Sequence, residues 1–182
     1  QPRFEGGAMT AEVLYGGRDP FSRKIILDRG GQHGIKAGQV VVDDAGVIGQ
    51  VTRAHSWVSE VTLVTDKDHA VPVQIARSGL RAIVFGHGRD GGLELRFMPV
   101  NADIQNGDLL VTSGIDGIYP PGLPVATVTR IERNAAEPFA RISCIPAAGV
   151  ERSRQVLILA EGPKFPEKPA ESAEIKAKPK KS

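Results

Sequence analysis

Cysteine and aromatic residues are scarce, and long apolar runs are missing. The one cysteine, Cys144, excludes an internal disulfide and a metal site made of cysteines alone. Its place in an alternating apolar stretch favours a small buried side chain. No apolar run approaches the roughly 20 residues that a membrane-spanning helix needs. No signal peptide is visible and the first residue is Gln, so we expect a segment of a longer protein.

The charge is unevenly distributed along the chain. Residues 161–182 hold six Lys and four Glu, which accounts for the whole formal net charge of +2. The rest of the chain is formally neutral, which argues against a nucleic-acid partner, because such binding needs a clustered basic face. The tail also contains four prolines and cannot bury enough apolar surface to fold. We therefore predict that 161–182 is disordered.

Short runs rich in Val and Ile, separated by Gly and Asp, make up most of the chain. They predict an all-β protein without helices, whose first strand spans Ala11 to Tyr15. Residues 93–97 alternate apolar with charged side chains, as a half-exposed strand should. We predict two small six-stranded β-barrels in tandem, because closed barrels leave no free edges. The first comprises residues 11–66 and is completed by strand 155–160, and the second comprises residues 67–150.

One sequence pattern occurs twice and supports this organisation. Residues 35–42 and 104–111 each read Ile, two polar or small residues, Gly, a polar residue and three apolar residues. Val-Thr-Arg follows each copy. Gly38 and Gly107 hold the same place in the two copies, so we expect each to adopt a positive φ in a turn. The repetition favours two similar β-domains.

Three further glycines are expected to shape turns. Gly46 ends an Asp-Asp-Ala-Gly turn, where glycine supplies positive φ. Gly49 lies inside the next strand, where it indicates a bulge or a close approach of two backbones. Gly122 ends a long turn that two prolines stiffen.

Tandem barrels also occur in trypsin-like hydrolases, so we searched for a catalytic triad. Ser113 is followed by glycine, but Gly-Asp-Ser-Gly is absent and the four histidines are scattered. A triad needs three groups in register and backbone donors for the oxyanion. Asp66, Asp68 and His69 favour a solvated turn over a metal site. We predict no enzyme activity, metal or cofactor, and keep a trypsin-like double-barrel hydrolase, active or degenerate, as the alternative.

Apolar side chains in predicted loops indicate a binding surface instead. Exposed aromatic residues with little charge around them are typical of interface cores. We predict a partner-binding surface on the second barrel, with Trp57 of the first barrel as a further candidate. The predicted binding residues on the second barrel are Ile118, Tyr119, Pro121 and Phe139.

Several segments together resemble the family of the rod shape-determining protein MreC. The segments are 19–22 (Asp-Pro-Phe-Ser), 25–30, 34–41, 46–51, 112–114, Gly117 and 120–126. The likeness runs from about Ala11 to Ala160. Ala126 departs from it, because the family often has a second glycine there.

This resemblance implies a non-enzymatic scaffold at the periplasmic face of the bacterial inner membrane. The family's β-domain is two six-stranded barrels, joined to the membrane through a segment that is missing from this chain. The implied role is to maintain rod shape by binding and organising peptidoglycan synthases of the elongation machinery. The implied partners are the elongation-specific class B penicillin-binding protein, with MreD, RodA and MreB in the same complex. Homodimers or filaments are implied as well, whereas the footprint of the partner stays open.

Overall fold

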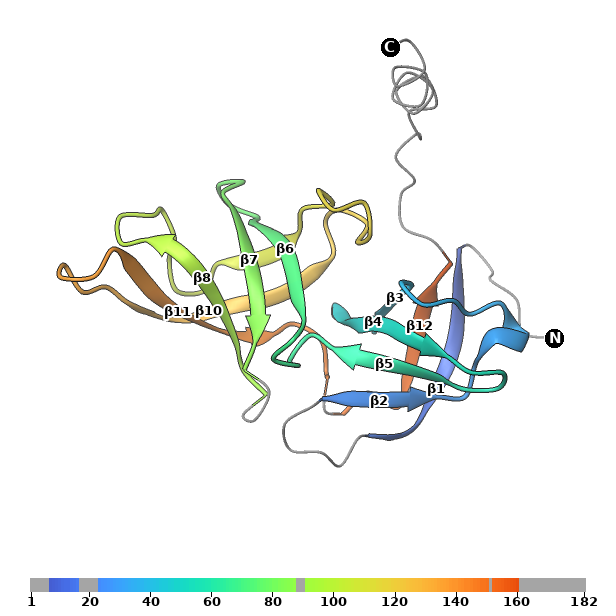
Figure 1. The fold of residues 1–182 in the computed structure, drawn as a ribbon. Coiled ribbons are helices and arrows are strands. Elements are labelled where there is room, and N and C mark those ends of the chain that lie inside the picture. Colours follow the sequence, from blue (N-terminus) through green and yellow to red (C-terminus); the bar gives the residue numbers. More distant parts are fainter. Residues whose placement is uncertain (1–6, 17–22, 88–90, 151, 161–182) are drawn as a thin grey trace, which may run out of the picture.

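The computed structural model describes residues 7–16, 23–87, 91–150 and 152–160, and the tail predicted to be disordered lies outside them. The described residues form twelve β-strands and one short 3-10 helix, η1 (Gly31–His33). Figure 1 shows the strands gathered into two barrels that lie beside each other. The prediction of an all-β fold with two closed six-stranded barrels is confirmed.

The first barrel closes in the order β1, β12, β3, β4, β5, β2. Its strands are β1 (Ala8–Gly16), β2 (Lys24–Leu27), β3 (Val40–Val42), β4 (Val47–Ala54), β5 (Ser59–Leu63) and β12 (Gln155–Leu159). β12 thus comes back from the far end of the chain to pair with β1 and β3. β1 begins three residues before the expected strand, because Met9 is buried and pairs with Ile158.

The second barrel closes in the order β10, β11, β8, β7, β6, β9. Its strands are β6 (Ala70–Ile75), β7 (Arg81–Gly86), β8 (Leu93–Pro99), β9 (Leu109–Thr112), β10 (Pro124–Glu132) and β11 (Phe139–Pro146). β12, the last described strand, belongs to the first barrel and not to the second. The division of the chain into domains near residue 66 stays a prediction.

The repeated sequence pattern has the same backbone structure in both barrels. The amide of Gly38 donates to the carbonyl of Val51 at 2.7 Å, and the amide of Gly107 donates to the carbonyl of Val128 at 2.8 Å. The two glycines have φ of 101° and 90°, in the left-handed region that side chains disfavour. Each pattern therefore enters its strand through the same glycine turn.

The other turn glycines differ in what requires them. Gly46 lacks a positive φ, so the expected reason is wrong. A Cβ on Gly46 would lie 2.5 Å from the carbonyl oxygen of Pro124, in the second barrel, so glycine is needed where the barrels touch. A Cβ on Gly49 would collide with the carbonyl of Thr62 in β5, a close approach of two strands. Gly122 has a φ of 89°.

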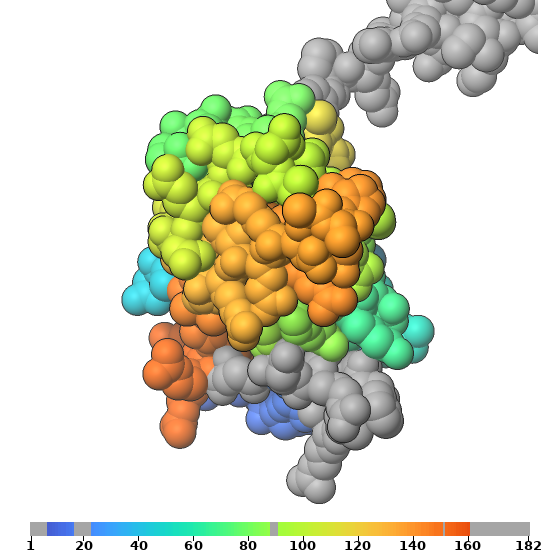
Figure 2. Space-filling model, turned by 90° about the vertical axis from the view of Figure 1, so that its left-hand side faces the viewer, coloured from blue at the N-terminus to red at the C-terminus, as the bar shows by residue number. Residues whose placement is uncertain are grey.

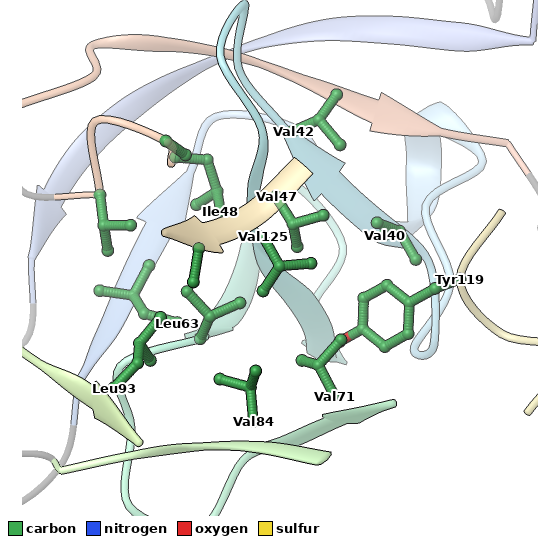
Figure 3. Packing of buried hydrophobic residues seen from close by; sticks show 14 of the residues in the cluster. Val40, Val42, Val47, Ile48, Leu63, Val71, Val84, Leu93, Tyr119 and Val125 are labelled. Atoms are coloured by element: carbon green, nitrogen blue, oxygen red, sulfur yellow. The ribbon is translucent and has the colours of Figure 1, made fainter. Parts of the chain in front are cut away.

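Buried apolar residues form one cluster that includes both barrels. Figure 3 shows Val40 and Val47 of the first barrel near Val71 and Val125 of the second. Cys144 is part of this cluster, and burial raises the pKa of its thiol to about 12. The thiol therefore stays protonated and acts as a small apolar side chain.

We expect Gly38→Ala and Gly107→Ala each to lower the free energy of unfolding by about 1–3 kcal/mol, because alanine is strained at positive φ. Space is not limiting at either site, since nothing lies within 4 Å of the added Cβ. Gly16→Ala is the matched control, as Gly16 has no positive φ and its Cβ meets only ordinary contacts of 3.9 and 4.0 Å. Equal urea midpoints for all three variants and the parent would contradict the duplicated turn.

Candidate functional site

Three of the side chains considered for catalysis have structural partners. His69 shares a hydrogen bond with Tyr119, His87 pairs with Glu94, and the Ser113 hydroxyl accepts the amide of Ile115. Within the described ranges, no group of three or more His, Cys, Asp or Glu side chains is placed to hold a metal ion. These contacts give the trypsin-like alternative no support.

Tyr119 lies in the core rather than on a binding surface. Its side chain is 1% exposed, and its hydroxyl is 2.6 Å from Nε2 of His69. Figure 3 shows the ring near Val40 of β3 and Val71 of β6, so it bridges the two barrels. The expectation that Tyr119 contacts a partner is wrong, because its ring is folded into the core, whereas Ile118 and Pro121 of the same loop are exposed.

Burial also sets the protonation of this bridge. It lowers the pKa of His69 to about 4 from its ordinary 6.5, and the nearby charge of Asp66 opposes the shift only in part. Burial raises the pKa of the Tyr119 hydroxyl above its ordinary range. Both side chains are therefore neutral near pH 7, as a buried hydrogen-bonded pair should be.

The most unusual surface feature is an exposed pair of phenylalanines on the second barrel. Phe97 of β8 is 69% exposed and Phe139 of β11 is 45% exposed. Their rings meet edge to face with centroids 5.9 Å apart. Such a contact fixes both rings before any partner arrives, which reduces the side-chain entropy lost on binding.

A bulge and a strained backbone turn Phe97 outward. The register between β8 and β11 shifts after Leu95, so Arg96 and Phe97 both point out while Met98 is buried. Phe97 has a φ of 65° and is the one residue other than glycine with a positive φ in the described part of the chain. A bulky side chain in this conformation costs on the order of 1–3 kcal/mol, and such strain concentrates at functional positions.

The first barrel has no counterpart to this bulge. β2 and β5 hold the places there that β8 and β11 hold in the second barrel. They pair in regular register from Lys24 to Leu27. The exposed phenylalanine pair is thus an addition to one barrel and is not needed to close a barrel of this type.

Trp57, with 67% of its surface accessible, and Tyr15, with 64%, are the two most exposed large apolar side chains described in the first barrel. The turn of Trp57 is held firmly, because Gly31 donates to the carbonyl of His55 at 2.6 Å and Gln32 donates to that of Ser56 at 2.9 Å. The His33 ring contacts the indole edge to face, with centroids 5.8 Å apart. Trp57 is therefore an aromatic side chain presented on a rigid turn.

The predicted binding residues do not form one surface. Figure 1 shows the β10–β11 connection, next to Phe139, at the end of the second barrel farthest from the first barrel. Figure 2 views the molecule from that end, where this connection lies beside the segment of β8. Trp57 lies in the β4–β5 connection at the opposite end of the molecule. Ile118 and Pro121 lie in the loop whose Tyr119 faces the first barrel.

The sequence pattern does not predict that Phe97 is exposed. Its alternation with Leu93 and Leu95 predicts a side chain facing the barrel interior. The one available signal was the adjacent apolar pair Phe97 and Met98, which breaks the alternation and is typical of a bulge.

A family model described as "Rod shape-determining protein MreC, barrel core" matches residues 13–160. The chain belongs to the MreC family. It is 38% identical over 151 residues to the cell shape-determining protein MreC of Escherichia coli, covering 83% of this chain and 41% of the relative. MreC of Haemophilus influenzae is 41% identical over 149 residues, with 82% and 42% covered. The chain spans about two fifths of the length of these relatives.

Solved structures agree with the family assignment. A crystal structure of MreC from Pseudomonas aeruginosa shares 41% identity and a TM-score of 0.81, covering 84% of this chain and 98% of that chain. A complex of a penicillin-binding protein (PBP2) and MreC from Helicobacter pylori shares the fold, with a TM-score of 0.63 at 19% identity over 84% of this chain and 97% of that chain. The described residues contain no helix long and apolar enough to cross a membrane.

We expect the stability of the protein to fall as the pH drops from about 6.5 to about 4. The unfolded chain protonates His69 near pH 6.5, whereas the folded chain does so only near pH 4. The contribution of His69 to stability is therefore complete above about pH 6.5. The free energy of unfolding falls by about 3 kcal/mol as the pH drops to about 4. Urea unfolding at several pH values measures the loss. His69→Gln keeps a partner for Tyr119 but cannot titrate in this range, so an equally steep pH dependence in that variant would contradict the assignment to His69.

Proposed function

We propose that this chain is the partner-binding β-domain of a scaffold that maintains rod shape by organising peptidoglycan synthases. Membership of the MreC family supports the role, and so does the Helicobacter pylori relative seen in complex with PBP2. The proposed location is the periplasmic face of the inner membrane. The proposed principal partner is the elongation-specific class B penicillin-binding protein, with MreD, RodA and MreB in the same assembly and with self-association into dimers or filaments.

A binding role fits the surface better than a catalytic one. His69, His87 and Ser113, which were considered for catalysis, are engaged in structural contacts. The apolar groups that do reach solvent sit on well-held turns and strands. We infer that the chain acts through its surface and without chemistry of its own.

The observation that carries the proposal is the exposed pair of Phe97 and Phe139. Aromatic side chains that are fixed in place and surrounded by polar residues are typical of the centre of an interface. Phe97 combines a positive φ with an exposed ring, and backbone strain of this kind concentrates at functional positions. We propose the Phe97–Phe139 pair as the main contact, with Ile118, Pro121 and Trp57 as further contacts.

We expect Phe97→Gly combined with Phe139→Ala to weaken binding of the periplasmic part of the penicillin-binding protein about tenfold or more, since truncating a central aromatic costs roughly 1–2 kcal/mol or above. A calorimetric or optical titration with the purified partner measures this. Phe97→Gly also removes the positive-φ strain, so the variant should unfold at a urea concentration no lower than the parent's.

Ile145→Ala is the control for that experiment. Ile145 lies on the same strand, β11, and is 55% exposed, but it is near the opposite end of the strand from Phe139. Its truncation should leave the affinity unchanged. An unchanged affinity for the folded phenylalanine double variant would reject the second barrel's end as the contact, and Trp57→Ala would then be the variant to test.

A further inference from the structure

The two barrels match strand for strand, with one exception in chain order. Read from the strand that carries the repeated pattern, the first barrel runs β3, β4, β5, β2, β1, β12 and the second runs β9, β10, β11, β8, β7, β6. Strands β1 to β5 thus correspond to β7 to β11 in sequence order. The sixth strand differs, because β12 follows all the others whereas β6 precedes its barrel.

The register of the two barrels agrees all the way round. The paired residues can be followed from the matched glycine turns, through β4 and β5 in the first barrel and through β10 and β11 in the second. On this path, Leu27 of β2 corresponds to Leu95 of β8. Counted the other way, through β12 and β1 or through β6 and β7, Leu27 again corresponds to Leu95. The two barrels therefore share strand order and total stagger, and together with the repeated sequence pattern this supports two copies of one unit.

The sixth strands are equivalent in their packing as well. Val156 and Ile158 of β12 take the places in the first barrel that Val73 and Ile75 of β6 take in the second. All four side chains are buried. β6 and β12 are therefore equivalent in register and in the positions of these buried side chains.

The connections show which strands belong to one unit. After β5, the amide of Val64 donates to the carbonyl of Ile48 at 2.9 Å, and after β11, the amide of Ala147 donates to the carbonyl of Val125 at 2.9 Å. The chain thus leaves both barrels in the same way and then enters the other barrel. The repeated units are β1–β6 and β7–β12, and each unit gives its sixth strand to the barrel of the other.

We propose that the place between β1 and β3, which β12 occupies, is a binding site for the sixth strand of another unit. A second copy of this chain can then supply its own β12 to this place. The chain already accepts β12 there from a unit other than that of β1 and β3. A reciprocal exchange between two copies would remake every backbone pair and core contact that β12 has now, as in other strand-swapped dimers.

The connection to β12 explains why a single chain closes on itself when dilute. The Asp43 carboxylate accepts hydrogen bonds from the amide of Gly149 at 2.8 Å and from the hydroxyl of Ser153 at 2.7 Å. This holds the connection against the first barrel, so β12 is presented to its own chain at an effective concentration on the order of millimolar. Exchange between copies therefore needs β12 to be released and the protein to be concentrated.

The test uses two full-length variants in a Cys144→Val background, since Val61 holds the matching place in the first barrel. One carries Thr10→Cys and the other Leu157→Cys, two exposed positions that face each other across β1 and β12. We expect a disulfide-linked heterodimer after the two are unfolded together, refolded at high concentration and oxidised. Its yield should rise with protein concentration, and its far-UV spectrum and melting should match the parent's.

Two controls separate strand exchange from chance collision. One chain carrying both cysteines should form an internal disulfide, which shows that the pair is competent. Replacing Leu157→Cys by Gln155→Cys, which faces Glu12 instead, should lower the heterodimer yield severalfold. Equal yields for the two positions, or no heterodimer at any concentration beside an efficient internal disulfide, would overturn the proposal.

The chain without introduced cysteines gives an independent readout. Sedimentation should detect a dimer after refolding at high concentration that persists when the sample is diluted, because β12 must leave one barrel before the chains can part. Surface association is rapidly reversible, so a dimer that dissociates at once on dilution would also overturn the strand exchange. Neither result depends on the proposed binding of a penicillin-binding protein.

Discussion

Closure of the first barrel depends on a strand from the other end of the chain. Without β12, β1 and β3 would each present a row of unpaired amides and carbonyls, and Val41 and Met9 would lose the cover of Ile158. Unpaired edges are costly when buried and adhesive when exposed. The first barrel is therefore not one continuous piece of sequence, because the whole second barrel lies between β5 and β12.

This interdependence fixes the two barrels relative to each other. The core is continuous, Gly46 leaves room for the carbonyl of Pro124, and Tyr119 reaches from the second barrel to His69 in the connection between the barrels. Trp57 and the Phe97–Phe139 pair, at opposite ends of the molecule, are therefore held at a fixed separation and orientation. A scaffold that positions partners needs this rigidity, because a hinge between its binding surfaces would leave their spacing undefined.

Local sequence rules predicted the parts of the structure that depend on local chemistry. The two glycine turns, the short β-branched strands and the closed barrels follow from spacing and composition, and Gly38 and Gly107 have the conformation that their pattern required. The same rules failed where a distant residue decides the outcome. Tyr119 lies in a proline-stiffened loop that looks exposed, but its partner His69 lies 50 residues earlier in the chain. Gly46 is needed because of Pro124, which no turn rule includes.

Phe97 shows why the candidate site was harder to predict than the fold. Alternation along β8 sends Phe97 into the core, and only the bulge after Leu95 reverses it, so the rule that locates cores conceals the site. The matching strand β2 pairs with β5 without a shift, which shows that a barrel of this register does not need a bulge at this place. Duplication therefore supplies an internal reference: features shared by both barrels, such as the glycine turns, serve closure, whereas a strained and exposed feature present in one barrel serves something beyond closure. The bulge of β8 is such a feature, because it combines an exposed aromatic side chain with a positive φ at a residue other than glycine, and this supports the proposal that Phe97 contacts a partner.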